Sequence, residues 1–242
     1  MLHGATAKDS ASILMIVAVT GLGREARLIS RPDITTVIGG GDAHGLRKRI
    51  RDALDQGARR VLSIGICGAL APSLDVGDCI VATDVVTEDE RFATHGPWTS
   101  ELLDSIPNAV PASLAGTDTI LASTADKKAL HRATNAAVAD MESHVAARVA
   151  FDCGMPFAAV RVVSDSASRT LPPAAMVAMT KSGDVDIFAV LRSLASKPAQ
   201  IPALIRTAWE AEKAFRVLHS CRHVLDPRLV PAPLGELSLD LG

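Results

Sequence analysis

The stretch "ILMIVAVTGLGREA", residues 13–26, joins a short apolar run to a turn that contains two glycines. A continuous apolar run of this length is typical of a strand covered on both faces of a sheet. The turn matches the pattern G-x-G-x-x-G/A, which leads from a strand into a helix and brings backbone close to a pyrophosphate. Asp42 follows about 20 residues later, where that pattern expects an acid for a ribose hydroxyl. The stretch predicts a strand–turn–helix unit, and an NAD-dependent oxidoreductase is the first candidate function.

The rest of the chain continues to alternate apolar strands with helical patterns, and no internal repeat is visible. This alternation predicts an α/β fold with three α/β/α layers around a central mixed, largely parallel sheet. The expected strands are 13–19, 34–38, 60–67, 79–86, 136–141 and 157–163. The expected helices are 24–30, 43–56, 125–134, 142–153, 172–180, 184–196 and 199–221.

We expect one domain over residues 1–242, with a C-terminal helix and tail at 198–242. The segment 88–115 contains prolines and reads as an irregular surface excursion that borders a site or an interface. The last helix carries Ile205, Trp209 and Phe215 near one side, which indicates packing on the domain or on a partner subunit. Transient contact with a membrane surface is the alternative interpretation of this helix.

Composition excludes several classes of function. The chain has 242 residues, a formal net charge of −2 and 3% aromatic residues, which argues against a nucleic-acid partner. The run 13–19 is shorter than the roughly 20 residues that span a bilayer, and no signal-peptide pattern precedes it, so we expect a cytoplasmic protein. The cysteines and histidines are scattered, which predicts neither disulfides nor a metal site.

Three acidic residues stand at or just after the ends of predicted strands. Glu25 lies in the first turn, Glu142 follows the strand 136–141, and Asp165 follows the strand 157–163. In open α/β sheets, ligands gather outside the carboxyl ends of the strands. Each acid alone is also explained as a surface charge or as an acid at a helix N-terminus. Their common placement predicts a site in which three carboxylates converge on a ligand.

Longer stretches carry a resemblance to a known superfamily. The segments "SIGICGALAPSLDVGDCIVATDVV", "VADMESHVAARVA" and "PFAAVRVVSDSA" together resemble purine nucleoside phosphorylases and methylthioadenosine/S-adenosylhomocysteine nucleosidases, from about residue 13 to 195. The details "TGLGREAR", "VIGGGD", "RTLPPAAMVAM" and "VLRSLASKPAQIPALIR" are most similar to hopanoid-associated members, which remove adenine from adenosylhopane to give ribosylhopane.

The resemblance implies a role for each acid. Asp165 would protonate the departing purine near N7, Glu142 would accept hydrogen bonds from the ribose 2′- and 3′-hydroxyls, and Glu25 would activate the attacking water. Breaking the glycosidic bond builds positive charge on the sugar, as in glycoside hydrolysis. Met141 would pack against the sugar. The other residues expected to bind substrate are Gly68, Cys67, Ser164, Ile120, Leu121 and Arg161. No cofactor and no metal are expected.

The stretch "VLSIGICGA" bears on the choice between hydrolysis and phosphorolysis. Similar phosphorylases hold phosphate with an Arg and a Ser there, whereas this chain has Ser63 and Ile66 at those positions. The loss of the charge-assisted contact favours water. Phosphate remains an alternative ligand through the backbone amides of 65–68 with help from Arg24, Arg27 or Ser63.

The loop "GTDTILA" has Ile120 and Leu121 where methylthioadenosine nucleosidases carry a Phe that stacks on adenine. Aliphatic packing suits an adenine nucleoside with a large apolar 5′ group, and 88–115 and the C-terminal helix are candidates to line its channel. A phosphorylase and a methylthioadenosine/S-adenosylhomocysteine nucleosidase are the alternative enzymes. An oxidoreductase and a non-catalytic nucleoside sensor or lipid-pathway scaffold are the rivals from other classes. The resemblance implies a homo-oligomer, with a dimer favoured.

Overall fold

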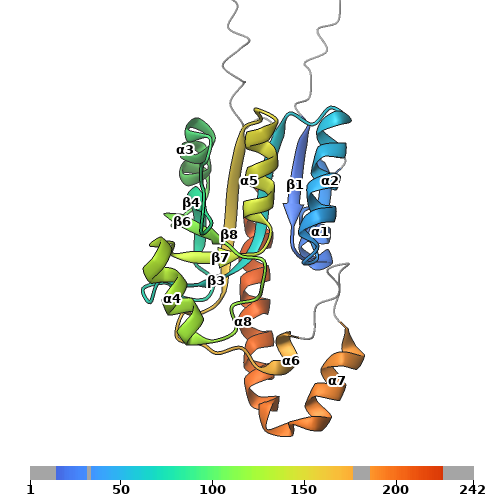
Figure 1. Ribbon diagram of the computed structural model, residues 1–242, viewed down its shortest axis with the longest axis vertical. Helices are drawn as coiled ribbons and strands as arrows, with labels where there is room; N and C mark the ends of the chain where they lie inside the picture. The colour runs from blue at the N-terminus through green and yellow to red at the C-terminus, as the bar shows by residue number, and fades with distance from the viewer. Residues whose placement is uncertain (1–14, 32–33, 177–185, 226–242) are drawn as a thin grey trace, which may run out of the picture.

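The computed structural model describes residues 15–31, 34–176 and 186–225 (Figure 1). Its first unit is the strand–turn–helix unit that the opening stretch predicts, although residues 13 and 14 lie outside the described part. The strands are β1 (Ile16–Thr20), β2 (Ile34–Ile38), β3 (Arg60–Ala69), β4 (Cys79–Val86), β5 (Arg91–Ala93), β6 (Val110–Gly116), β7 (Val138–Asp140) and β8 (Phe157–Asp165). The helices are α1 (Gly23–Ile29), α2 (Ala43–Asp55), α3 (Gly96–Ser105), α4 (Thr124–Thr134), α5 (Ser143–Asp152), α6 (Pro173–Met176), α7 (Ile187–Ser196) and α8 (Ile201–Ser220), with 3₁₀ turns at Pro198–Gln200 and Cys221–Leu225.

The eight described strands form one mixed sheet, which confirms the expected fold class. Parallel pairs join β1 to β2 and β3, β3 to β8, and β6 to β4 and β7. Antiparallel pairs join β4 to β5 and β8, and β3 to β7. Because β7 pairs with both β3 and β6, the strands β3, β8, β4, β6 and β7 close into a ring. The sequence pattern did not indicate this closure.

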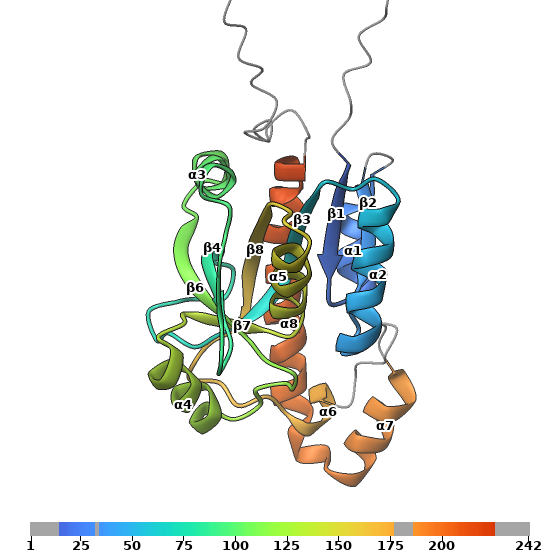
Figure 2. The same cartoon turned by 45° about the horizontal axis from the view of Figure 1, so that its top comes forward.

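Two hydrophobic cores lie on opposite faces of the sheet. Along β1, Val17 and Val19 belong to the core that includes residues of α2 and α5. The alternate residues Ile16 and Ala18 belong to the core that includes Trp98 of α3 and residues of α8. Successive side chains of a strand point to opposite faces, so a strand covered on both sides is apolar throughout. Figures 1 and 2 show α5 and α8 on either side of β3 and β8.

The expectation that 88–115 is irregular is wrong. This segment contains β5, α3 and the start of β6, and Trp98 in α3 is 1% exposed. Its prolines misled the sequence reading because they occupy positions where a missing N–H is tolerated. Pro97 lies in the first turn of α3, and Pro111 lies near the start of β6. The segment is part of the core and the sheet.

The C-terminal helices agree with the expected ones where they are described. α6 and α7 begin at Pro173 and Ile187, and residues 177–185 between them lie outside the described part, as does the tail after 225. α8 has two different halves. Phe215 and Leu218 are buried in the core, whereas Trp209, nearer its start, is 77% exposed. None of the described helices is long and apolar enough to cross a membrane.

The central position of β3 gives a test of the fold. Ile64 is fully buried, so we expect Ile64→Ala to lower the free energy of unfolding by about 2–5 kcal/mol, through lost burial and an unfilled cavity. The same change at Ile205, which is 54% exposed, serves as the control and should shift it by less than about 0.5 kcal/mol. Urea unfolding measures both. Equal losses at the two positions would contradict this placement of the core.

Candidate active site

A cavity lies at the carboxyl ends of β1, β3 and β8, the edge at which the sequence predicted that the acids converge. Segment 117–121, after β6, forms another wall. Neither segment 88–115 nor α8 lines this cavity, so the expected channel-lining role of both is wrong for this cavity. Of the residues expected at the site, all except Arg161 line it, namely Glu25, Cys67, Gly68, Ile120, Leu121, Met141, Glu142, Ser164 and Asp165.

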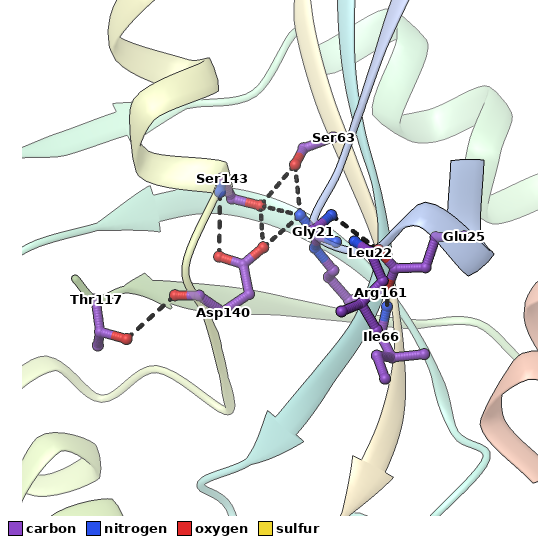
Figure 3. A network of polar contacts seen from close by, with 9 residues as sticks. All are labelled: Gly21, Leu22, Glu25, Ser63, Ile66, Thr117, Asp140, Ser143 and Arg161. Atoms are coloured by element: carbon purple, nitrogen blue, oxygen red, sulfur yellow. Dashed lines mark hydrogen bonds and ion pairs between the residues drawn. The ribbon is translucent and has the colours of Figure 1, made fainter. Parts of the chain in front are cut away.

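Glu25 lies at the start of α1 and is held by three backbone N–H groups (Figure 3). Its Oε2 accepts hydrogen bonds from the N–H groups of Gly21 and Leu22, both at 2.8 Å, and its Oε1 accepts one from Ile66 at 2.7 Å. Burial raises the pKa of Glu25 above its ordinary value, while Arg161 and these N–H groups act in the opposite direction. The carboxyl group is therefore fixed in place and is a better base than an exposed glutamate.

Glu142 follows β7 and lies against two glycines. A Cβ atom at Gly21 would lie 2.9 Å from its carboxylate oxygens, and one at Gly39 would lie 2.5 Å from its Cγ. Both positions therefore need glycine for close approach. Burial, with the neighbouring carboxylate of Asp140, raises the pKa of Glu142 to about 8, although Arg161 lowers it. The turn glycine of the opening stretch thus makes room for an acid from another part of the chain.

Arg161 does not line the cavity, which corrects the expectation that it contacts substrate. It is 1% exposed and forms an ion pair with Asp140 behind the acids. Its Nη2 also donates hydrogen bonds to the hydroxyl oxygens of Ser63 at 2.5 Å and Ser143 at 3.1 Å (Figure 3). Its Nε and Nη1 are buried and make no hydrogen bond within the described part. This one guanidinium therefore supplies positive charge to Glu25, Asp140 and Glu142 together.

Asp165 ends β8 and lines the cavity next to Lys127 of α4. The ammonium group of Lys127 forms an ion pair with Asp165 Oδ2. Ser164 Oγ lies 3.1 Å from the other carboxylate oxygen and 3.0 Å from the carbonyl oxygen of Cys67. A Cβ at Gly68 would lie 3.3 Å from Asp165, so glycine lets β3 pass close to the carboxyl group.

Three of the groups that could hold an anion near β3 have other partners. Ser63 is fully buried and accepts a hydrogen bond from Arg161, and the Ile66 N–H donates a hydrogen bond to Glu25. Arg24 pairs with Glu212 of α8 at 2.6 Å. Asp42, which seemed to complete the dinucleotide pattern, begins α2 instead, and its carboxylate accepts a hydrogen bond from the Gly45 N–H at 3.0 Å. That is the ordinary role of an aspartate at a helix N-cap.

The remaining walls of the cavity are mostly apolar. Ile120, Leu121 and Leu171 line it, together with Leu22 and Ile66, and Met141 lies between the two acids of the D-M-E-S stretch. Burial raises the pKa of the Cys67 thiol well above its ordinary value, so Cys67 acts as a neutral wall group. In the described ranges, no group of three or more His, Cys, Asp or Glu side chains is arranged to hold a metal ion.

Sequence reasoning missed two charged residues of the site. Asp140 lies in the same D-M-E-S stretch as Glu142, and its ion pair with Arg161 could have been inferred from one acid and one cation that both stand in otherwise apolar strands. Lys127 gave no such signal. It stands beside Lys128 in an ordinary helix with several charged residues, where a lysine is usually exposed, yet it is 1% exposed.

Comparisons with known proteins agree with this geometry. The family model described as Phosphorylase superfamily matches residues 16–194. A 5′-methylthioadenosine/S-adenosylhomocysteine nucleosidase from Marinomonas sp. (strain MWYL1) is 28% identical in an alignment of 142 residues, and the match covers 46% of this chain and only 58% of that protein.

Solved structures share the fold. A Helicobacter pylori 5′-methylthioadenosine/S-adenosyl homocysteine nucleosidase matches with a TM-score of 0.59 and 17% identity, over 86% of this chain and 97% of that chain. A futalosine hydrolase from the same organism matches with a TM-score of 0.62 and 14% identity, over 88% and 97%.

The raised pKa of Glu142 predicts how stability depends on pH. Between its ordinary value of 4.5 and about 8, the folded protein keeps a proton that the unfolded chain has released, so the free energy of unfolding falls as pH rises. Glu142→Gln mimics the protonated side chain and should flatten this fall. Urea unfolding at several pH values from 5 to 8 measures both slopes, and equal slopes would contradict the prediction.

Proposed function

The chain belongs to the phosphorylase superfamily, and we propose that it cleaves the N-glycosidic bond of a 5′-substituted adenine nucleoside by addition of water. The observation that carries this proposal is the arrangement of Glu25, Glu142 and Asp165 around one cavity. Glu25 and Glu142 both lie beside Gly21, and Asp165 lies beside Gly68. Acids at these two places suit a reaction in which one end of the substrate gains positive charge and the other end leaves as a base.

In the proposed reaction, the C–N bond weakens and positive charge develops on the ribose. The buried carboxyl of Glu142 accepts the ribose hydroxyls and, when ionised, stabilises that charge. Asp165 gives a proton to the purine at N7 as the base departs, a contribution of roughly 10²–10⁴-fold for general acids. Glu25 takes the proton of the water that attacks the sugar. Its three backbone hydrogen bonds hold it in one orientation for this step.

Three observations support water over phosphate. Ser63 is buried, the Ile66 N–H is engaged by Glu25, and Arg24 is engaged by Glu212. Binding phosphate at this wall would require new partners for a doubly charged group next to the carboxyl of Glu25, at a cost in repulsion. Phosphorolysis is the second candidate reaction because the superfamily is described by its phosphorylases.

We further propose adenosylhopane as the substrate, with adenine and ribosylhopane as the products. The aliphatic walls from Ile120, Leu121 and Leu171 support an apolar ligand. 5′-Methylthioadenosine and S-adenosylhomocysteine are the alternative substrates, favoured by the name of the Marinomonas relative.

Release of free adenine tests the reaction. Purified protein should release adenine from adenosylhopane, and from methylthioadenosine or S-adenosylhomocysteine more slowly, at the same rate with and without phosphate. Asp165→Asn should lower kcat by about 10²–10⁴-fold, because the amide cannot supply the proton. Its circular dichroism spectrum should be unchanged.

The same assay distinguishes the alternative functions by different results. Strict dependence on phosphate would identify a phosphorylase, and preference for a small 5′ group would identify a methylthioadenosine-type nucleosidase. Tight nucleoside binding without turnover would identify a sensor. Unchanged activity of Asp165→Asn would refute its role as the acid.

A lipid-linked substrate requires access to a membrane, and we propose that α7 and the first half of α8 supply a transient contact. The exposed side chains of Phe188, Leu191, Ile205 and Trp209 make this surface apolar. Arg192, Lys197 and Arg206 on the same elements are also exposed. Apolar and basic residues together are typical of helices that lie on an anionic membrane surface. Figures 1 and 2 show these elements at the end of the molecule towards which β1 runs.

Flotation with vesicles tests this contact. The full chain should float with phosphatidylglycerol vesicles and not with phosphatidylcholine vesicles, because the basic residues favour anionic lipid. The double variant Phe188→Ser, Trp209→Ser should not float. Phe151→Ser removes an equally exposed aromatic from α5 and is the matched control. Equal flotation of all variants, or none by the wild type, would contradict the proposal.

We also propose a homodimer in solution. Analytical sedimentation without vesicles measures whether the wild type and the Phe188→Ser, Trp209→Ser variant are dimers. A monomeric variant would assign the apolar surface of α7 and α8 to a contact between subunits instead of a membrane.

A further inference from the structure

Lys127 is a buried cation whose hydrogen-bonding capacity is already used. Its side chain lines the same cavity as Asp165 and is 2% exposed. The ammonium group has three N–H donors. They meet Asp165 Oδ2, the carbonyl oxygen of Ser166 at 3.0 Å and the carbonyl oxygen of Arg169 at 3.2 Å. Lys127 therefore has no donor left for a ligand, and its effect on the reaction passes through Asp165.

Packing alone does not account for a lysine at this position. Moving an ammonium group out of water is costly, and the attraction of one partner repays that cost only with good additional hydrogen bonds. Lys127 has both, because two carbonyl oxygens of the segment after β8 complete its contacts. These contacts also fix the segment 166–169 relative to α4. The carboxyl group of Asp165 is thereby held from one side, with its other oxygen beside Ser164.

We propose that Lys127 is a positioning residue for Asp165, which aims its carboxyl at the purine and stabilises the carboxylate that remains after proton transfer. This inference rests on the proposed function. In the step, the O–H bond of Asp165 breaks and an N7–H bond forms, while the electron pair of the C–N bond goes to the purine. Water adds to the sugar and gives its proton to Glu25. The ion pair in the structure is the state of Asp165 after donation, and solvent supplies a proton for the next cycle.

The charged and titratable surroundings of Asp165 come from three sides. Lys127 contacts it from α4, and Cys67 faces it from β3 with a thiol that burial keeps neutral. Glu25, Asp140 and Glu142 line the same cavity and share Arg161. Among the described residues, Lys127 is the cation that contacts Asp165. Its removal should therefore leave the carboxylate that forms on proton transfer without a compensating charge.

The test compares Lys127→Met with Lys127→Arg and with Lys128→Met, which changes the exposed neighbour in the same helix. Two substrates with the same 5′ group are used, an adenine nucleoside and a 4-nitrophenyl riboside, whose leaving group departs without a proton. Lys127→Met should lower kcat for the adenine nucleoside at least about 10-fold on the pH plateau, with KM within about 2-fold. The alkaline limb of its pH profile should move to higher pH.

The controls separate positioning from folding. Hydrolysis of the nitrophenyl riboside should change by less than about 3-fold in Lys127→Met, and Lys128→Met should match the wild type. Lys127→Arg keeps the positive charge, so the alkaline limb of its pH profile should match that of the wild type even if its kcat is lower. If Lys127→Met does not fold, the comparison of Lys127→Arg with the wild type provides the test.

Two results would overturn this role while the proposed function stands. One is adenine release by Lys127→Met at the wild-type rate. The other is an equal loss on both substrates with an unmoved alkaline limb, which would make Lys127 purely structural. A wild-type protein that releases no adenine would overturn the proposed function and this role with it.

Discussion

The hydrogen bonds that three backbone N–H groups donate to Glu25 tie together the parts on which the site depends. Two of the donors come from the β1–α1 turn and the third comes from Ile66 of β3. A single buried carboxyl thus joins the turn to the neighbouring strand and fixes the distance between them. Gly65 makes this approach feasible, because a Cβ there would lie 2.6 Å from Glu25 Oε1 and 2.4 Å from Arg161 Nη1. Arg161 then supplies the charge that keeps several carboxyl groups in one small volume.

Much of the fold could be predicted because its strands are covered on both faces. Runs such as 16–19 and 157–160 are apolar throughout because they serve two cores, and that pattern is visible in the sequence. The closure of the ring by β7 could not be predicted, because a strand of three residues carries no periodicity. The segment 88–115 was misread because proline at the start of a helix and proline in a loop look alike in a single sequence.

The site followed from the sequence where its residues stand at strand ends and match a known pattern, as Glu25, Glu142 and Asp165 do. Arg161 shows the limit of that reasoning. The resemblance implied substrate contact, but its buried side chain forms an ion pair with Asp140 and does not line the cavity. Lys127 shows the opposite limit, because its burial depends on how α4 packs against the end of β8. Neither direction is encoded in local spacing.

The walls of the cavity differ in how they are built. The acids are held by backbone donors, by glycines with no room for a Cβ, and by a buried guanidinium, so few substitutions are tolerated there. The segment 117–121 is anchored at Thr117, whose N–H donates to the carbonyl oxygen of Asp140 at 2.9 Å. Its hydroxyl group donates to the same oxygen at 3.3 Å (Figure 3). Beyond that anchor, Ile120 and Leu121 line the cavity. Substitution of these two aliphatic residues would therefore reshape one wall of the cavity while the acids and the backbone that holds them stay as they are.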